Sequence, residues 1–361
     1  MEWTGMERAL AKTAMPVAGA QYPGVRDYRR RRWLRVKGRE GRANCLHVMS
    51  RIVDGLPFFG EEDKDALVVM LFRMAKFCRV KVLTYCVMGN HFHALIEVPD
   101  GEKIRCHFRD REKGWERLYS HLGCLYSKAY VAGLKRKVSS LLEGGRLEEV
   151  EEIREAFLKR MGDVSRFVWE LKERFTKWFN KTHGRRGTLW QGRFKSVLVE
   201  GCERSQDDDG GYSQALRTMA SYIDLNPVRA GLVEDPAEYR WCGYAAALAG
   251  QRRARRGLCQ VMGAGTDCWD EAGVAVSYRT LLESHGLGRD SCEEAASEDS
   301  LSDLAAKSVP ALTRGFAIGE KGFVKEVFGE YREHFGRKRR AGPRELGEGR
   351  LYTLRKTRGA P

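Results

Sequence analysis

The sequence has no long hydrophobic run and no pattern that would direct the chain to a membrane. Hydrophobic residues make up 42% of its 361 residues, yet no stretch approaches the roughly 18 to 20 consecutive apolar residues that a membrane helix needs. Residues 1–24 are interrupted by Glu, Arg and Lys and lack the compact apolar core of a secretory signal. We therefore expect a soluble protein without such a signal.

The ten cysteines are never arranged as a C-x-x-C pair. Their spacing argues against a zinc ribbon or a redox motif, and several lie in apolar runs where a reduced thiol acts as a small hydrophobe. We therefore expect a cytosolic protein. No internal repeat is apparent, and the length predicts one main domain with a smaller one.

Positive charge is in excess and is concentrated in blocks. The net charge is +15 and the pI is near 9.4. Dense basic blocks occupy 26–42, 251–257 and 336–344. Such blocks commonly meet polyphosphate, which favours a nucleic-acid partner over the alternative of solvated tails that only keep the protein soluble. Attraction between basic side chains and phosphates does not depend on the base sequence, so the charge does not indicate which nucleic acid the protein binds.

The first part of the chain predicts a strand, a helix and an antiparallel strand pair. Residues 44–53 are a short apolar and β-branched run that indicates a strand. Residues 60–78 form an amphipathic pattern that begins with acidic residues, as a helix favours. The runs 81–88 and 91–98 flank Gly89-Asn90, a link typical of a tight hairpin.

The next part alternates helices with a further strand. Residues 101–164 are charge-rich and predict a helical insertion, and 164–180 carry apolar residues at the spacing of a core-facing helix. The second half of 183–200 indicates a strand. Residues 212–233 predict a helix that ends close to Pro227, because proline disfavours helical geometry in the preceding residue. The sum is an α/β sandwich with a mainly antiparallel sheet.

These patterns predict three parts of the chain. Residues 1–43 form a basic N-terminal extension, and 44–250 form the main domain with its insertion at about 101–164. Residues 251–361 form a basic accessory region with an acidic, Ser-rich linker at about 291–307 and a helix at 320–335. Its arginines predict a second grip on a nucleic-acid partner.

Two histidines, His91 and His93, stand one residue apart on the predicted strand 91–98. Residues i and i+2 of a strand point to the same face, so both imidazoles project together. Two neutral imidazoles can hold one divalent metal, but a catalytic metal usually takes about three protein ligands. The pair is also compatible with one packed and one solvated histidine.

The helix 212–233 offers a further ligand. Tyr222 and Asn226 are four residues apart and lie along one edge of the helix's apolar stripe. A phenol there could reach a metal site on the sheet, and the Asn226 oxygen is a hard donor suited to Mg²⁺ or Mn²⁺. The alternative is a boundary aromatic and an ordinary residue before a proline. The stripe itself consists of Leu216, Met219, Ala220 and Ile223.

Three separated blocks resemble one known family. "YCVMGNHFHALIEVP" (85–99), "GTLWQGRFKSVLVE" (187–200) and "SYIDLNPVRAGLVEDPAEYRWCGY" (221–244) are similar, in this order, to the REP-associated tyrosine transposases, members of the single-tyrosine HUH transposase superfamily. "YPG" at 22–24 and "HVMSR" at 47–51 echo the family's opening segment, whereas the arginine-rich stretch between them departs from its compact start. The resemblance covers roughly residues 44–250.

The resemblance implies a ferredoxin-like, RRM-like sheet flanked by helices and an HUH endonuclease mechanism. In the family, the positions of His91, His93 and Asn226 hold Mg²⁺ or Mn²⁺, and the tyrosine at the place of Tyr222 attacks a scissile phosphate. The product is a 5′-phosphotyrosine and a free 3′-hydroxyl, from which strands can be rejoined without ATP. The implied substrate is single-stranded DNA folded into hairpins, and the implied protein is a monomer of a bacterial-type cytosol, associated with the nucleoid.

Further residues are candidates for supporting roles. Arg193, Arg217 and Arg229 could stabilise the charge that develops at the phosphate, or could be plain DNA-backbone contacts or surface charges. Trp190 and Trp241 could stack unpaired bases, or could be core or edge packing. The remaining histidines considered have no ligand-spaced partner, and we expect them to be structural or solvated: His47, His107, His121 and His183.

Two other functions stay open from the sequence. A domesticated or inactive protein of the same fold could bind nucleic acid without turnover. A metal-dependent phosphohydrolase that uses water as its nucleophile would not need Tyr222. The co-occurrence of His91, His93, Tyr222 and Asn226 favours the strand-transfer enzyme, because a binding protein has no physical need for the whole set.

Overall fold

The computed structural model describes residues 43–55, 58–110, 113–201, 213–265, 268–269, 273–286, 311–335, 342–346 and 351–355. Among them the chain divides into two compact units. The first holds Asp65–Val80 and Val98–Thr188, and the second holds Asn44–Lys64, Lys81–Glu97 and the residues from Leu189 onward. No helix in these ranges is both long and apolar enough to span a membrane.

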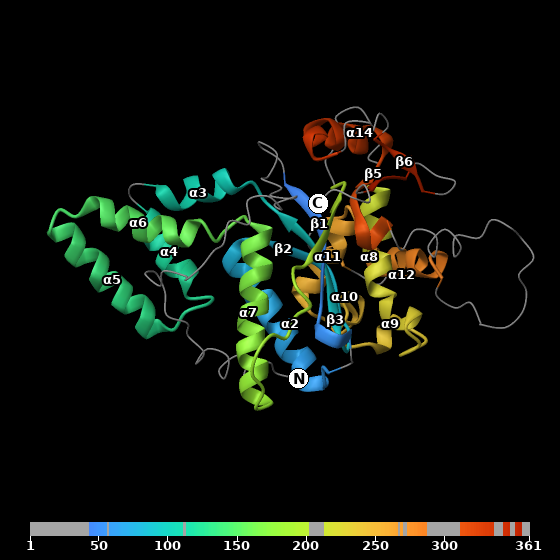
Figure 1. The fold of residues 1–361 in the computed structure, drawn as a ribbon, viewed down its shortest axis with the longest axis horizontal. Coiled ribbons are helices and arrows are strands. Elements are labelled where there is room, and N and C mark those ends of the chain that lie inside the picture. The colour runs from blue at the N-terminus through green and yellow to red at the C-terminus, as the bar shows by residue number, and fades with distance from the viewer. Residues whose placement is uncertain are drawn as a thin grey trace, which may run out of the picture. The chain divides into compact units, whose positions relative to one another are not determined.

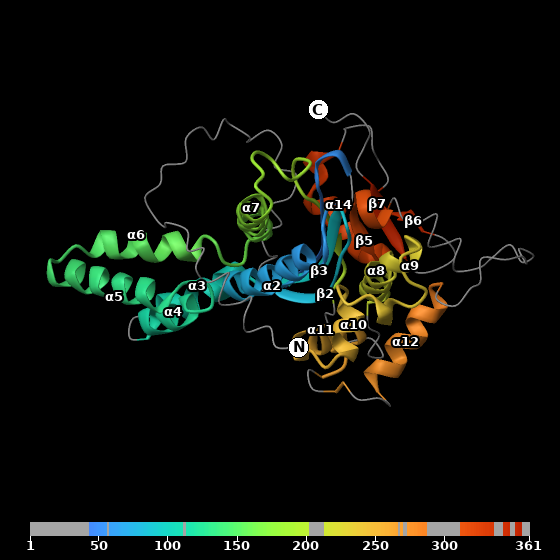
Figure 2. The same ribbon diagram turned by 90° about the horizontal axis from the view of Figure 1, so that it is seen from below.

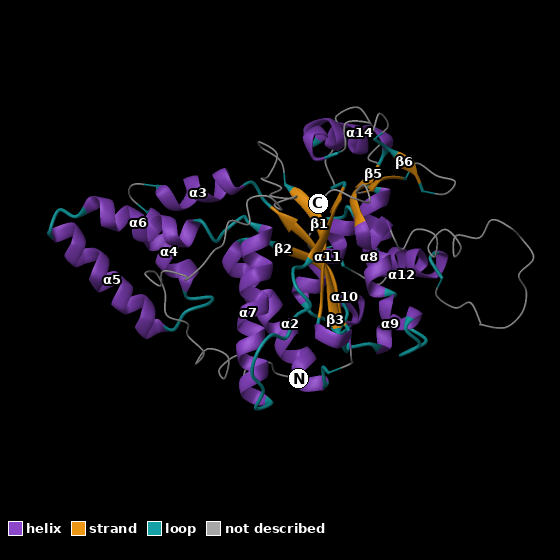
Figure 3. Ribbon diagram, in the orientation of Figure 1, coloured by secondary structure: helices purple, strands orange, loops and turns teal. Residues whose placement is uncertain are grey.

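The second unit is built on a seven-stranded sheet with the order β2-β3-β1-β4-β5-β7-β6 (orange in Figure 3). Four of its five recorded pairings are antiparallel, and β4 with β5 is parallel. The predicted mixed α/β fold with a mainly antiparallel sheet is therefore confirmed. The strands are β1 (Asn44–Arg51), β2 (Lys81–Val87), β3 (His91–Val98), β4 (Lys195–Val199), β5 (Gly315–Gly319), β6 (Arg344–Glu345) and β7 (Tyr352–Arg355).

The strands β2 and β3 form the predicted hairpin across Gly89-Asn90, where the Met88 amide donates to the His91 carbonyl at 2.8 Å. In their register Cys86 lies opposite His93. Directly opposed residues share a face of the sheet, so the face that carries His93 also carries Cys86 and, two residues along, Thr84.

The helix α8 (Gln214–Asp224) packs on the sheet through the predicted apolar stripe, whose four members are all fully buried. It begins at Ser213, whose hydroxyl accepts from the Leu216 amide at 3.2 Å. It contacts β2, β4 and β5. Because β3 and β1 lie between β2 and β4 in the sheet, α8 must cross over both of them. The short α9 (Asn226–Arg229) follows, with Pro227 in its first turn.

Further helices complete the second unit. Helix α11 (Arg252–Met262) packs on β2 so closely that a Cβ on Gly257 would stand 2.2 Å from the Leu83 carbonyl oxygen. Helix α14 (Lys321–Glu330) contacts β5 and β7. The other helices are η2 (Val53–Gly55), η3 (Pro236–Glu238), α10 (Gly243–Leu248), α12 (Val274–Ser284) and η4 (Arg332–His334).

The first unit is helical in all its described elements (Figures 1 and 2). The helix α7 begins at Asp163, whose carboxylate accepts from the Arg166 amide, and buries Phe167, Leu171 and Phe175. The helices are most of α2 (Glu61–Cys78), α3 (Gly101–Arg109), α4 (Gly114–Leu122), α5 (Lys128–Glu143), α6 (Leu147–Leu158) and α7 (Val164–Thr182). Helices α3 to α6 lie within the helical insertion predicted at about 101–164, and α5 contacts α6.

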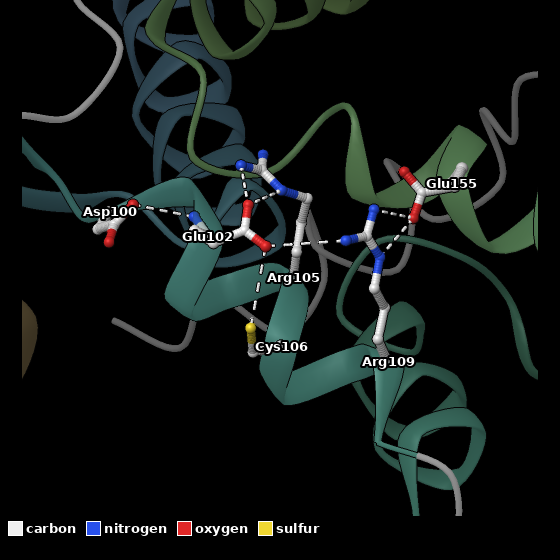
Figure 4. A network of polar contacts seen from close by, with 6 residues as sticks. All are labelled: Asp100, Glu102, Arg105, Cys106, Arg109 and Glu155. Carbon is white, nitrogen blue, oxygen red and sulfur yellow. Dashed lines mark hydrogen bonds and ion pairs between the residues drawn. The ribbon is translucent and has the colours of Figure 1, made fainter. Parts of the chain in front are cut away.

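Charged side chains connect the helices of the first unit. Figure 4 shows Glu102 accepting from Arg105 at 2.6 Å on α3, while Arg109 donates to Glu155 of α6 at 2.8 Å. A more buried pair forms where Arg160 donates to both oxygens of Glu170 at 2.6 Å. This pair is bidentate, so its geometry is more restricted than that of a single contact.

The boundary predicted at residue 250 stays a prediction, but the structure adds an observation about the accessory region. Strand β5 pairs with β4, so β5, β6 and β7 of this region belong to the same sheet as β1 to β4. The basic block 26–42 and the linker 291–307 lie outside the described residues, as does most of 336–344.

Candidate active site

Three histidines meet on the face of the sheet that α8 crosses. His91 and His93 lie on β3, and His47 lies on the neighbouring strand β1. The His93 ring lies edge to edge with the His47 ring, with centroids 5.0 Å apart, and the His91 and His93 centroids are 4.9 Å apart. The predicted pair is therefore part of a row of three imidazoles.

The His47 side chain joins β1 to the C-terminal part of the sheet. Its Nδ1 lies 2.8 Å from the Leu312 carbonyl oxygen, and its Nε2 lies 2.8 Å from Nδ1 of His93. His47 is 1% exposed and His93 is 2% exposed. Both rings are therefore shielded from solvent, and these hydrogen bonds to other protein groups orient them.

A second contact orients His91. Its Nδ1 lies 2.5 Å from the side-chain oxygen of Asn90, whose amide nitrogen donates to the Gly55 carbonyl. Since the Asn90 oxygen can only accept, His91 carries its proton on Nδ1 and keeps a lone pair on Nε2. This is the form in which a histidine binds a metal, with the other ring nitrogen fixed by a hydrogen bond.

The surroundings keep these imidazoles neutral. Burial lowers the pKa of His47 to about 4, and burial followed by the charge of Arg51 lowers the pKa of His91 to about 4. Burial, aided by the neighbouring His47, lowers the pKa of His93 well below its ordinary value. Neutral rings suit metal ligation, so the donor chemistry of His91 and His93 fits a divalent ion. No group of three or more His, Cys, Asp or Glu side chains in the described ranges could hold one, so a third ligand would come from another residue type or the substrate.

Tyr222 of α8 stands over this row. Its ring centroid is 5.9 Å from that of His93 and 6.1 Å from that of His47, in edge-on geometry. The residue is 6% exposed, so it is more buried than the boundary position that we expected. Burial raises the pKa of Tyr222, and the positive charge of Arg229 opposes that rise.

Arg229 and Asn226 are both anchored on the end of α8. Arg229 donates to the Tyr222 carbonyl at 2.9 Å and lies 5.0 Å from the centre of the Tyr222 ring. Asn226 donates from Nδ2 to the same carbonyl at 2.9 Å and to the Ile223 carbonyl at 3.3 Å. Pro227 has no N–H for Ile223, so the side chain replaces it. Because both partners are carbonyls, the Asn226 oxygen faces away from them as an acceptor.

A buried carboxylate fixes the helix that carries Tyr222. Asp224 is 0% exposed, and both its oxygens accept from the Thr84 hydroxyl of β2 at 2.9 Å. It also accepts from the Tyr278 hydroxyl at 2.6 Å and the Tyr244 amide at 3.3 Å. Burial raises the pKa of Asp224 to about 6, and these donors oppose the rise. The network pins α8 to β2, to α10 and to α12.

Of the other predicted residues, the two tryptophans are buried and the two arginines are more exposed. Trp190 is 5% exposed and packs edge-on against Phe92 and Phe59. Phe92 lies on the face of β3 opposite His91 and His93, so Trp190 has the contacts of a core residue and presents little ring surface for a base. Arg193 is exposed in the loop before β4, and Arg217 is half-buried in α8. Trp241 is 8% exposed beneath Lys64, whose Nζ lies 4.1 Å from its ring.

Sequence reasoning missed three residues. We expected His47 to be structural or solvated for want of a nearby partner, but its partner His93 is 46 positions away in the sequence. The sequence motifs assign no role to Asp224 or Arg51. The available signal was that Asp224 follows Tyr222 by two residues and stands among apolar residues, where a charged residue needs a buried partner.

Comparisons with known proteins give little further information. No family model and no curated protein matches the chain. A solved structure, that of a REP-associated tyrosine transposase bound to a REP hairpin, is 14% identical over 63% of this chain and 88% of that one, with a TM-score of 0.31. At that TM-score the likeness carries no argument, and any function must rest on the geometry of the site.

Proposed function

We propose that this protein is a metal-dependent enzyme that cleaves and rejoins single-stranded, hairpin-containing DNA through a 5′-phosphotyrosine intermediate. Tyr222 is the nucleophile in this proposal. His91, His93 and Asn226 are the ligands of one divalent ion, Mg²⁺ or Mn²⁺. The sequence resemblance to the tyrosine transposases supplied the hypothesis, and the arrangement of the side chains supports it.

The observation that carries the proposal is the meeting of a phenol with two oriented imidazoles. Tyr222 comes from a helix and the histidines come from strands, yet the centre of the Tyr222 ring lies 5.9 Å from that of His93 and 6.1 Å from that of His47. His91 adjoins His93, with ring centres 4.9 Å apart. His91 keeps its Nε2 lone pair because Nδ1 donates to Asn90. A purely structural core would gain nothing from three neutral histidines beneath a tyrosine, because each buried polar ring needs a partner.

The chain's own residues would act on the phosphate in a defined order. The Tyr222 oxygen forms a bond to phosphorus, and the bond from phosphorus to the 3′-oxygen breaks. The phenol proton is lost, and the departing 3′-oxygen takes up a proton. When bound, the ion would supply Lewis-acid polarisation of the scissile phosphate. The ester bond keeps the energy of the broken one, so the reverse attack rejoins strands without ATP.

The raised pKa of Tyr222 shows what the site must supply. A buried phenol is a poor nucleophile at neutral pH, so positive charge near its oxygen is required. Arg229 supplies part of it from its place over the ring. Arg51 is exposed at the end of β1, and its charge lowers the pKa of His91 and His93. These two arginines are the best-placed contacts for a phosphate, and Arg193 and Arg217 remain candidates for the DNA backbone.

The test is a denaturing-gel assay with end-labelled single-stranded hairpin DNA and Mn²⁺, with and without EDTA. Wild type is compared with Tyr222→Phe and His91→Ala. Tyr239→Phe is the matched control, since that buried hydroxyl donates to the Val87 carbonyl at 2.8 Å and contacts no residue of the histidine row. We expect a protease-sensitive adduct in wild type and in the control, and at least a 100-fold loss in the other two variants.

Two outcomes would overturn the proposal. Cleavage that persists in Tyr222→Phe without any adduct would indicate a phosphohydrolase that uses water. Binding without an adduct across a varied hairpin pool would indicate a protein that binds nucleic acid without turnover. A loss of adduct in the Tyr239→Phe control would show that the variants fail for structural reasons.

A further inference from the structure

The carbonyl of Leu312 dictates where the protons lie in the histidine row. A backbone carbonyl oxygen only accepts hydrogen bonds, so Nδ1 of His47, 2.8 Å away, must carry a proton. A neutral imidazole has one N–H, so Nε2 of His47 carries none and is an acceptor. That Nε2 lies 2.8 Å from Nδ1 of His93, which therefore must donate. His93 is then left with a lone pair on Nε2.

The contact with His47 opposes the intrinsic preference of an imidazole ring. A free imidazole favours a proton on Nε2, which would block that atom as a ligand. His47 and His93 are both buried, with 1% and 2% exposure, so water does not compete for the contact. The two ring planes differ by only 14° and the ring centres are 5.0 Å apart, so the rings lie nearly in one plane, as a hydrogen bond between their edges requires. The proton pattern is thus set by one carbonyl and passed on through His47.

The source of that carbonyl is remote in the sequence. Leu312 is buried just before β5, the strand that pairs in parallel with β4, and is 265 positions from His47. β1, which carries His47, pairs with β4 on its other side. The segment that bears Leu312 is therefore held by the sheet against the histidine row.

We propose that His47 is a positioning residue which, directed by the Leu312 carbonyl, holds His93 in the Nδ1–H form and keeps its Nε2 free to bind a divalent metal. The C-terminal segment before β5 is thereby part of the site. This inference rests on the proposed metal site, in which His93 is a ligand. It assigns a role to a residue that makes no contact with the metal itself, as partners of ligating histidines commonly do.

A variant pair separates this role from packing. In His47→Gln the side-chain oxygen can accept from His93 while the amide nitrogen donates to Leu312. His47→Phe fills a similar volume but offers His93 no acceptor. We expect Gln to preserve the Nδ1–H form of His93 and Phe to lose it, with His93 carrying its proton on Nε2 in part or in full.

The measurement is ¹⁵N NMR of the histidine side chains in the full-length, metal-free protein near pH 7.5, which distinguishes the protonated from the unprotonated ring nitrogen. Titration with Mn²⁺, followed by its EPR signal, gives the affinity of each variant. We expect a 10- to 100-fold loss of Mn²⁺ affinity in His47→Phe and less than a 3-fold loss in His47→Gln. Circular dichroism confirms that each variant is folded.

The inference is overturned by a wild-type His93 that carries its proton on Nε2, a result that requires no variant. It is also overturned by an unchanged His93 tautomer or unchanged Mn²⁺ affinity in a folded His47→Phe. None of these measurements needs DNA, so they are independent of the adduct assay. An Nδ1–H His93 that binds Mn²⁺ in a protein without adduct formation would retain this inference while removing the proposed strand transfer.

Discussion

The buried carboxylate of Asp224 makes the stability of this protein depend on pH, and the Tyr278 hydroxyl, which donates to it, limits that dependence. We predict that Tyr278→Phe destabilises the second unit, and that the loss is larger at pH 8 than at pH 5. The removed hydroxyl donates to Asp224 at 2.6 Å, a shorter contact than those of Thr84 at 2.9 Å and Tyr244 at 3.3 Å. The contribution of this hydrogen bond to the free energy of unfolding depends on whether the carboxylate is charged.

The sign follows from the pKa of Asp224. Burial raises it to about 6 in the folded protein, above the value of about 3.9 for an unfolded aspartate. The group therefore favours the folded state most below about pH 4, and that contribution is lost as the pH rises through 6. Removing the Tyr278 donor raises this pKa further, so the penalty for ionising Asp224 grows at high pH. At pH 5 the carboxyl is mostly protonated and loses only a neutral hydrogen bond.

The magnitudes are separable by experiment. A hydrogen bond to a charged group contributes about 1.5–3 kcal/mol and a neutral one about 1 kcal/mol, so the loss should fall from about 2 kcal/mol at pH 8 to about 1 kcal/mol at pH 5. Urea unfolding at both pH values measures it. The control is Tyr239→Phe, whose hydroxyl donates to a backbone carbonyl, and which should lose about 1 kcal/mol at both. An equal loss at the two pH values in Tyr278→Phe would refute the reasoning.

Two further predictions concern packing and charge. Gly257→Ala should destabilise the protein by at least about 2 kcal/mol, because the added Cβ would press on the Leu83 carbonyl. Gly329→Ala in α14, where an added Cβ meets nothing within 4 Å, should stabilise the protein by about 0.5–1 kcal/mol. Thermal unfolding measures both variants. Opposite signs are required, and two losses would refute the packing argument. Glu170→Gln should lower the free energy of unfolding by about 3–5 kcal/mol because it leaves Arg160 buried without its charged partner. Glu173→Gln, which breaks a more exposed pair with Lys177, should lower it by less than about 0.5 kcal/mol. Urea unfolding measures both variants, and similar losses would count against the prediction.

Local patterns predicted the elements well because each depends on neighbours in the sequence. The hairpin at Gly89-Asn90, the apolar stripe of α8 and the helix end before Pro227 are all confirmed. The strand β1 was placed within two residues of its observed end. Each of these signals is contained in a window of a few residues, where periodicity and turn chemistry are informative.

Long-range partnerships could not be predicted in the same way. The contact of His47 with Leu312 spans the chain, and nothing near either residue indicates the other. Strand β5 has only five residues and is buried throughout, so no alternation of polar and apolar residues reveals its place in the sheet. Trp190 has an aromatic ring that could stack on a base, but this ring is buried against Phe92 and Phe59. Burial of this kind is decided by tertiary structure.

The contact between His47 and Leu312 can form only late in the protein's synthesis. A ribosome adds about 5–20 residues per second, so the 265 positions between the two residues correspond to a delay of roughly 13–53 s at that rate. During this time β1 has emerged, but the carbonyl that orders its histidine does not yet exist. A nascent chain therefore cannot complete its histidine row until Leu312 has been made and has left the ribosome, and until then His47 must wait without its partner.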